Sequence, residues 1–479
     1  MKIVARHSPL AYLISILTLI SGYAFISARW SNKSESYFTI EQSSGKHVLS
    51  AADEPSRFVP SLHVNSESNI SKSTFALTVP SMKKRNSGIP AAYMALDEIE
   101  TSIDRLLRTY PDLIYREQIG TSTTLGLPIW GIKISDHARE SQDEARILFA
   151  GVYHAREPIG SNICLALMQR LCSGYGRNEQ ITKWVNSLEI WFVPVVNPDG
   201  YRYIFENSRT FPWWRKNLRD NDGNGRFDPL YDGVDLNRNY DFNWKDGGDD
   251  KPGSWFYRGA DPFSENETRA IRDLTLRENF VIGISYHSYG ESILFPWGNF
   301  KRPPDLDLIV NIATKMAARI RRESGYGNYS VLPLNGLVGQ SSIWMYGHLR
   351  VFDYIVEVGT EYFPAAEKVP SIVDENVHGA FYLLERMLGT GIKGHVFDLH
   401  SRQPLLAKIK VRGYHADHVN SRRTEPESGA FYRLLKQGNY TLEIVADGYH
   451  RKVLPAVRVE KGEVAELEIG LIRKNGYTY

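Results

Sequence analysis

The stretch ILFAGVYHAREPI at residues 147–159 constrains the fold of this chain more than any other. Its first six residues are apolar, as in a buried strand, and Pro158 suits the first turn of a following helix, where its missing N–H would be unpaired anyway. His154 and Glu157 stand between the two. A strand that leads at once into a helix indicates an α/β fold, in which ligands bind at the carboxyl ends of the strands. We therefore expect this imidazole and carboxylate at such an edge.

A second histidine, His287, closes the apolar run of ISYHSYG and could reach the same edge. Two imidazoles and a carboxylate suit Zn²⁺, with water as a fourth ligand. The sequence therefore predicts one zinc ion per chain, bound by His154, Glu157 and His287. A hydrogen-bonded structural role for His287, or Glu291 as a ligand in its place, are the alternatives.

Glu357 lies within the apolar run VFDYIVEVG. A buried carboxylate needs a partner or a chemical role, because its desolvation is unfavourable. Beside a metal-bound water it could act as a general base. A buried salt bridge is the alternative, and Glu361 is the next candidate for the base.

The order of the patterns predicts two folded regions. Strand and helix patterns alternate over residues 91–388, which predicts an α/β domain with a mixed, partly parallel sheet flanked by helices. Over residues 389–479, short runs of alternating apolar and polar residues predict a small antiparallel β-sandwich.

The N-terminal part has a different composition. Residues 10–28 carry no charge and follow Lys2 and Arg6, which predicts a signal peptide or signal anchor over residues 1–28. The protein would then be exported, secreted or periplasmic, and attached to a membrane only if this segment is retained. Residues 29–90, rich in Ser, Asn and Lys, are typical of a disordered tether or a short pro-segment.

The near-neutral charge of the chain bears on whether it binds nucleic acid. The chain has 57 basic and 55 acidic side chains, and loss of Lys2 and Arg6 with the leader would balance them. A neutral balance argues against nucleic acid as a partner.

Six motifs occur in one order over residues 93–388: H-A-R-E-P, N-P-D-G-Y, W-R-K-N, D-L-N-R-N, S-Y-H-S-Y and I-V-E-V-G-T-E. Together they resemble the zinc metallocarboxypeptidases similar to carboxypeptidase A. The resemblance implies a monomer that cleaves the C-terminal peptide bond of peptides or proteins. It implies that the three ligands bind zinc, that Glu357 activates the zinc-bound water, and that Asn237 and Arg238 hold the substrate carboxylate while Arg156 helps to draw it in.

Two positions depart from the family pattern. Leu218 follows W-R-K-N where an arginine that polarises the scissile carbonyl is expected, so we assign that role to Arg219, with Arg215 as the alternative. Asn335 stands where the family has a mobile tyrosine, which predicts altered binding of the transition state. These departures favour a catalytically weak binding protein as one rival function. Among enzymes, the rival is an amidohydrolase acting on cell-wall peptides or acyl-amino acids.

Residues 389–479 resemble, on pattern and order, the transthyretin-like β-sandwich that follows the catalytic domain in some carboxypeptidases. Within the catalytic region, DNDGNGRFD matches part of a calcium loop, with Tyr231 in place of the usual closing glutamate. The alternative is a solvated polar turn. The possible calcium ligands are Asp220, Asp222, Asn224 and Asp228.

The family resemblance also bears on the side-chain pocket. Its floor would come partly from Ser341, Ser342 and Ile343, none of which is acidic. This predicts a preference for uncharged C-terminal residues, unless Glu291 or Asp353 reaches the pocket, because a buried cation needs an opposite charge.

Overall fold

The computed structural model describes residues 25–27, 37–42, 45–50 and 88–474, and the chain separates into two units, Met1–Phe75 and Ala76–Tyr479. In the first unit, β1 (Phe25–Ser27), β2 (Tyr37–Gln42) and β3 (Gly45–Ser50) form an antiparallel sheet. Most of the predicted leader, residues 1–24 and 28, and most of the predicted tether lie outside the described residues.

The strands β2 and β3 fall where the sequence was expected to carry no regular structure. The segment YFTIEQ contains aromatic and β-branched residues that favour extended backbone. The segment is short and lies among many Ser, Asn and Lys residues, a composition that predicts no regular structure.

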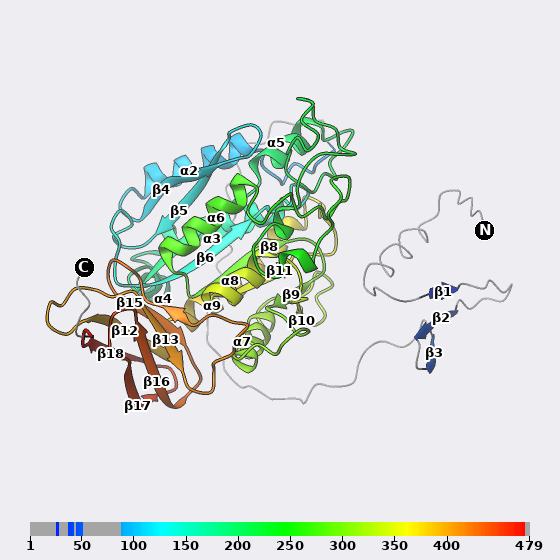
Figure 1. Cartoon of the computed structure of the whole chain (residues 1–479). Coiled ribbons are helices and arrows are strands. Elements are labelled where there is room, and N and C mark those ends of the chain that lie inside the picture. Colours follow the sequence, from blue (N-terminus) through cyan, green and yellow to red (C-terminus); the bar gives the residue numbers. More distant parts are fainter. Residues whose placement is uncertain (1–24, 28–36, 43–44, 51–87, 475–479) are drawn as a thin grey trace. The chain divides into compact units, whose positions relative to one another are not determined.

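In the second unit, a mixed eight-stranded sheet runs in the order β10-β9-β11-β8-β6-β7-β5-β4 (Figure 1). The central strands β11, β8, β6 and β7 are parallel, and β4 and β5 pair antiparallel on one side. This confirms the predicted mixed, partly parallel sheet. The strands are β4 (Ile114–Thr121), β5 (Pro128–Ile134), β6 (Ala145–Gly151), β7 (Leu188–Val193), β8 (Ile282–His287), β9 (Ser292–Phe295), β10 (Ser330–Pro333) and β11 (Phe352–Glu357).

Helices cover both faces of this sheet, because alternate residues of its central strands point to opposite sides and nearly all are apolar. Ile147 and Phe149 of β6 belong to the larger core, with α2, α3, α4, α7 and α9, whereas Leu148 and Ala150 join α6 and α8 in a second core. The helices are α2 (Leu96–Thr109), α3 (Ile159–Gly174), α4 (Glu179–Val185), α5 (Pro198–Glu206), α6 (Asn266–Glu278), α7 (Leu306–Ala317), α8 (Ser341–Leu349) and α9 (Val369–Met387). No helix among the described residues is both long and apolar enough to cross a membrane.

The parallel strands bring their carboxyl ends to one edge of the sheet. In the register between β11 and β8, Glu357 lies opposite His287. Beside β8, β6 ends at Gly151, just before the turn that carries His154 and Glu157. Strand pairing alone therefore collects three segments that are far apart in the sequence.

The C-terminal sheets, β12 to β18, share a core of their own, which includes Val396, Ile409, Phe431 and Ile444. One sheet has the order β15-β12-β18 and the other β14-β13-β16-β17. The sequence predicted antiparallel pairing throughout, but β12 and β18 are parallel, because the last strand returns beside the first in the same direction. The strands are β12 (Gly391–Asp398), β13 (Ala407–Val411), β14 (Arg422–Arg423), β15 (Ala430–Leu434), β16 (Gly438–Ala446), β17 (Lys452–Val459) and β18 (Val464–Leu471).

Candidate active site

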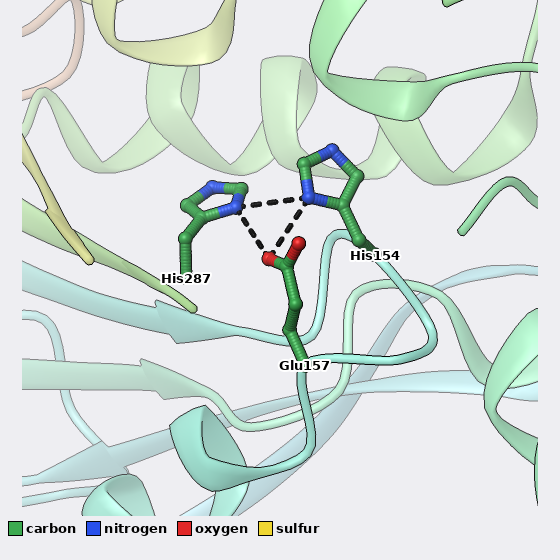
Figure 2. A group of neighbouring side chains, drawn as sticks. All are labelled: His154, Glu157 and His287. Carbon is green, nitrogen blue, oxygen red and sulfur yellow. Dashed lines mark hydrogen bonds and ion pairs between the residues drawn. The ribbon is translucent and has the colours of Figure 1, made fainter. Parts of the chain in front are cut away.

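Three side chains converge where β6 and β8 end (Figure 2). His154 Nδ1 lies 2.9 Å from Glu157 Oε2, and His287 Nδ1 lies 2.9 Å from that oxygen and 3.1 Å from His154 Nδ1. All three side chains are buried. The structure thus brings together the three residues predicted as zinc ligands.

This triangle has the size and chemistry of a zinc site. A tetrahedral ion with bonds of about 2.0–2.1 Å separates its ligand atoms by about 3.3 Å, close to the observed spacings. Two imidazole nitrogens and one carboxylate oxygen form a donor set that suits a catalytic zinc ion. Although burial alone would raise the pKa of Glu157, His154 and His287 hold it below its ordinary value, so this ligand is ionised.

Further groups orient each histidine from behind. Asp235 Oδ1 lies 3.1 Å from His154 Nε2, the ring nitrogen that faces away from the triangle. Asn237 Nδ2 lies 3.3 Å from His287 Nε2, and the Tyr153 ring stacks on the His287 ring. The sequence reading did not identify Asp235, although it opens the motif D-L-N-R-N. Its place at the start of that motif is the sequence feature that could have identified it.

Arg215 is the cation nearest to the ligands. Its Nε donates to Asp235 Oδ2 at 2.9 Å, and its Nη1 lies 3.2 Å from His154 Nδ1 and 3.6 Å from Glu157 Oε1. Burial favours loss of its proton, but Asp235 and Glu157 more than offset this and raise its pKa. A permanent cation therefore stands beside the metal ligands.

Arg219 lies elsewhere. Its side chain is partly exposed, and its Nε is 3.5 Å from Glu265 Oε1. The structure therefore places the alternative, Arg215, where the sequence reading had assigned Arg219. Residues 214–218 are all buried, and Arg219 is the first partly exposed residue after them.

Glu357 closes β11 opposite His287, and its side chain is still partly accessible to solvent. Burial, with help from the nearby Glu157 charge, raises its pKa to about 7, against the opposing effect of His287. A carboxyl in this range can both take up and release a proton near neutral pH. By contrast, Glu361 is exposed, and Glu291 is engaged away from the triangle, where its Oε1 accepts from the Glu323 N–H at 2.7 Å.

The predicted substrate-binding residues lie around the same centre. Arg238 Nη1 donates to the Asn237 carbonyl at 2.7 Å, and Arg238 belongs to the same short turn, Leu236–Arg238. The Arg156 guanidinium lies 4.3 Å from the Tyr362 ring centre and also faces the Trp255 ring. Its Nε is buried without a hydrogen-bond partner, and its Nη1 donates to the Trp213 carbonyl at 3.4 Å.

Asp353, one of the two acids considered for the side-chain pocket, is hydrogen-bonded to serine side chains. Ser342 Oγ donates to Asp353 Oδ2, which also accepts from Ser285 Oγ at 3.1 Å. Burial raises the pKa of Asp353 to about 6. Both Asp353 and Ser342 are fully buried, so this carboxyl already has serine partners inside the core.

Part of the predicted calcium loop is assembled. Oxygen atoms of Asp220, Asp222 and Asp232 lie within 4.8 Å of one another. Asp228 is not in this group and instead accepts from the Leu230 N–H, while Asn224 accepts from the Arg226 N–H. The loop instead brings in Asp232, which directly follows Tyr231 at the closing position.

Comparisons with known proteins agree with the family resemblance of the sequence motifs. The zinc carboxypeptidase family model matches residues 99–379. Carboxypeptidase B from Helicoverpa zea is 35% identical over 213 residues, 43% of this chain and 47% of its own length. Carboxypeptidase A2 from Rattus norvegicus is 32% identical over 254 residues, 52% of this chain and 58% of its own. The chain spans about half the length of the curated relatives it matches.

A solved structure agrees at the level of the fold. The carboxypeptidase A of Helicoverpa armigera is similar over 60% of this chain and 72% of its own, with a TM-score of 0.54 and 23% identity.

Proposed function

The chain belongs to the zinc carboxypeptidase family, and we propose that it is a metallocarboxypeptidase that hydrolyses the C-terminal peptide bond of peptides or proteins. One observation carries this proposal. His154, Glu157 and His287 form a metal-sized triangle, and Glu357 ends the strand next to His287. A metal and a general base at one site are the requirements for hydrolysing a peptide bond with water.

A zinc ion in the triangle would polarise the peptide carbonyl and lower the pKa of a bound water. Glu357 would take a proton from the attacking water and deliver it to the leaving amine. Its pKa of about 7 suits both transfers. Asp235 keeps His154 in the tautomer whose Nδ1 lone pair faces the triangle.

Charge on the oxygen of the scissile carbonyl would be stabilised by Arg215. Its guanidinium is fixed by Asp235 before substrate arrives, so little reorganisation is needed during the reaction. Arg219, paired with Glu265 away from the triangle, is not given this role.

Recognition of a free chain terminus would depend on Arg238 and Asn237. A guanidinium binds a carboxylate through two parallel N–H bonds, and Asn237 directly precedes Arg238 in the same short turn. Arg156, whose guanidinium lies against the Trp255 and Tyr362 rings, would attract the carboxylate through its charge as it enters. These groups require a terminal carboxylate, which makes the enzyme an exopeptidase.

Export remains a proposal that rests on the uncharged segment 10–28 and the basic residues before it. The C-terminal sheets are proposed to be a transthyretin-like β-sandwich, supported by their two sheets and shared core. Calcium binding by the acidic loop is likewise proposed, supported by the grouped oxygens of Asp220, Asp222 and Asp232.

The test is hydrolysis of matched substrates with and without a chelator. Blocked dipeptides with a free terminal carboxylate should be cleaved, the same dipeptides ending in an amide should not, and chelation followed by zinc should abolish and restore activity. Varying the last residue among Phe, Leu, Lys and Arg tests the predicted preference for uncharged side chains. Cleavage of cell-wall peptides or acyl-amino acids instead would favour the amidohydrolase, and no hydrolysis of any substrate would favour a binding protein.

A further inference from the structure

The N-terminal end of α8 holds Asn237. The Ser341 N–H and Ser341 Oγ both donate to Asn237 Oδ1, at 3.0 and 3.2 Å. The other side of the amide faces His287. The direction in which the Asn237 amide points therefore depends on where the first residue of α8 lies.

The opposite end of α8 is capped by the C-terminal sheets. A helix leaves its last carbonyls without partners inside the helix. The Asn420 N–H donates to the Gly347 carbonyl at 2.8 Å, and Arg422 Nη1 donates to the Leu349 carbonyl at 3.3 Å. Arg350, just beyond the helix, donates in return from Nε to the Asn420 carbonyl at 2.9 Å.

Arg422 joins three elements at once. Besides its bond to Leu349, it donates to the carbonyls of Asn279 and Phe280, which follow α6, and from Nε to Tyr432 of β15. Arg422 is 1% exposed, and within residues 88–474 it donates its hydrogen bonds to main-chain carbonyls. A guanidinium at the carboxyl ends of two helices is favourably placed, because those ends carry partial negative charge.

We propose that Arg422 is a positioning residue for the substrate-carboxylate site, acting through α8 on Asn237. The helix has 9 residues, so about 13 Å separates its two ends and one rigid element connects them. The C-terminal sheets would thus be part of the substrate-binding apparatus. This inference rests on the proposed function, because it requires Asn237 to bind the terminal carboxylate.

The test compares Arg422→Met and Arg422→Lys with Arg423→Met, an exposed neighbour on β14 that serves as the matched control. For a blocked dipeptide, Arg422→Met should raise KM about three- to thirtyfold, the range seen for residues that couple to a distant site. We expect kcat within about twofold of the wild type, because Glu357 and the three metal ligands are untouched. Zinc content should be unchanged.

A binding measurement separates positioning from general stability. The dissociation constant of 3-phenylpropanoate, a small carboxylate probe, should rise by the same factor as KM. Arg422→Lys should recover part of the loss, because an ammonium group keeps the charge but cannot span all the carbonyls. Amide exchange across Ser341–Leu349 should be faster in Arg422→Met, and if that variant does not fold, Arg422→Lys carries the comparison.

Equal KM and equal probe affinity in wild type and Arg422 variants, with faster exchange in α8, would overturn the inference. A wild type that binds the probe yet hydrolyses no peptide would instead count against the proposed function. In that case a weaker probe affinity in the Arg422 variants would still support the positioning role.

Discussion

Asp235 fixes the orientation of His154: its Oδ1 accepts from His154 Nε2 at 3.1 Å, while Nδ1 of the same ring faces Glu157 and His287. The second carboxylate oxygen is held by Arg215. Asp235 is fully buried, and although burial would raise its pKa, the neighbouring Arg215, Arg238 and His154 hold it well below its ordinary value. Asp235 thus determines which nitrogen of His154 faces the triangle, and it also holds the Arg215 guanidinium in place.

Replacing this carboxylate should weaken metal binding. We expect Asp235→Asn to lower zinc affinity by about 10–100-fold, as is typical when a group behind a metal-bound histidine is changed. Competition with a chromophoric chelator measures it. Asp353→Asn is a suitable control, because Asp353 is equally buried but hydrogen-bonds to serines. Equal zinc affinity in Asp235→Asn and wild type would contradict the assignment.

Removing the base should separate chemistry from metal binding. Glu357→Gln should retain zinc and bind substrate normally, while kcat falls by about 10²–10⁴, the usual contribution of a general base. Steady-state kinetics and metal analysis on one preparation provide both values. Glu361→Gln, at an exposed position, should keep wild-type kcat. If Glu357→Gln turns over normally, the base lies elsewhere.

The two arginine candidates predict opposite results. Arg215→Lys keeps a charge beside Asp235 but lacks the guanidinium fork, so kcat should fall by about 10²–10³, as when one donor to a developing oxyanion is lost. Arg219→Lys should leave kcat near the wild-type value, because Arg219 pairs with Glu265 instead. The reverse pattern would restore the original assignment of Arg219.

Glu267 should make stability depend on pH. Burial and the charge of Glu265 raise its pKa from 4.5 to about 7 in the folded protein. The folded state therefore binds this proton more tightly than the unfolded chain, and the resulting stability is present below pH 4.5 and lost as the pH rises through 7. The loss is about 3 kcal/mol at most, since each pKa unit corresponds to about 1.4 kcal/mol.

Thermal melts between pH 5 and 8 test this directly. As the pH rises, the melting temperature of Glu267→Gln should increase relative to that of the wild type, because the variant has no proton to release. Glu206→Gln, at an exposed site on α5, should follow the wild type throughout. A constant difference across the range would show that Glu267 does not titrate there.

Calcium should stabilise the acidic loop if the loop binds it. We expect calcium to raise the melting temperature of the wild type but not of a variant carrying Asp220→Asn and Asp222→Asn, because both carboxylates point into the group. Magnesium at the same concentration is the control for ionic strength. Melting curves that coincide with and without calcium would remove the proposal.

The ligand triangle was predictable because each ligand is tied to a strand end. His287 closes an apolar run, and His154 and Glu157 follow another directly, so the sheet topology alone predicts their meeting. Asp235 follows no strand, and only the folded loop brings it behind His154. Arg219 follows Leu218, where the family pattern has an arginine, and for that reason the sequence favours Arg219 over Arg215. Position along a loop does not show which of the two side chains reaches the ligands.

The role of the C-terminal sheets was also beyond the sequence pattern. Alternating apolar and polar residues predict strands within residues 389–479, and β12 to β18 all lie there. The pattern does not reveal which strand carries a buried arginine onto another domain. Arg422 stands among polar residues in the sequence, so its burial follows from tertiary contact and not from a local apolar pattern.

The parallel pairing of β12 with β18 has a consequence for the order of events during synthesis. β18 pairs with β12 along its full length, from Val464 to Leu471, so the C-terminal core cannot close until those residues have left the ribosome. At roughly 5–20 residues per second, Glu357 emerges on the order of 5–20 seconds earlier. The catalytic sheet therefore has all its strands while the partner that caps α8 is still incomplete. A nascent chain would bind metal before it can hold its substrate well.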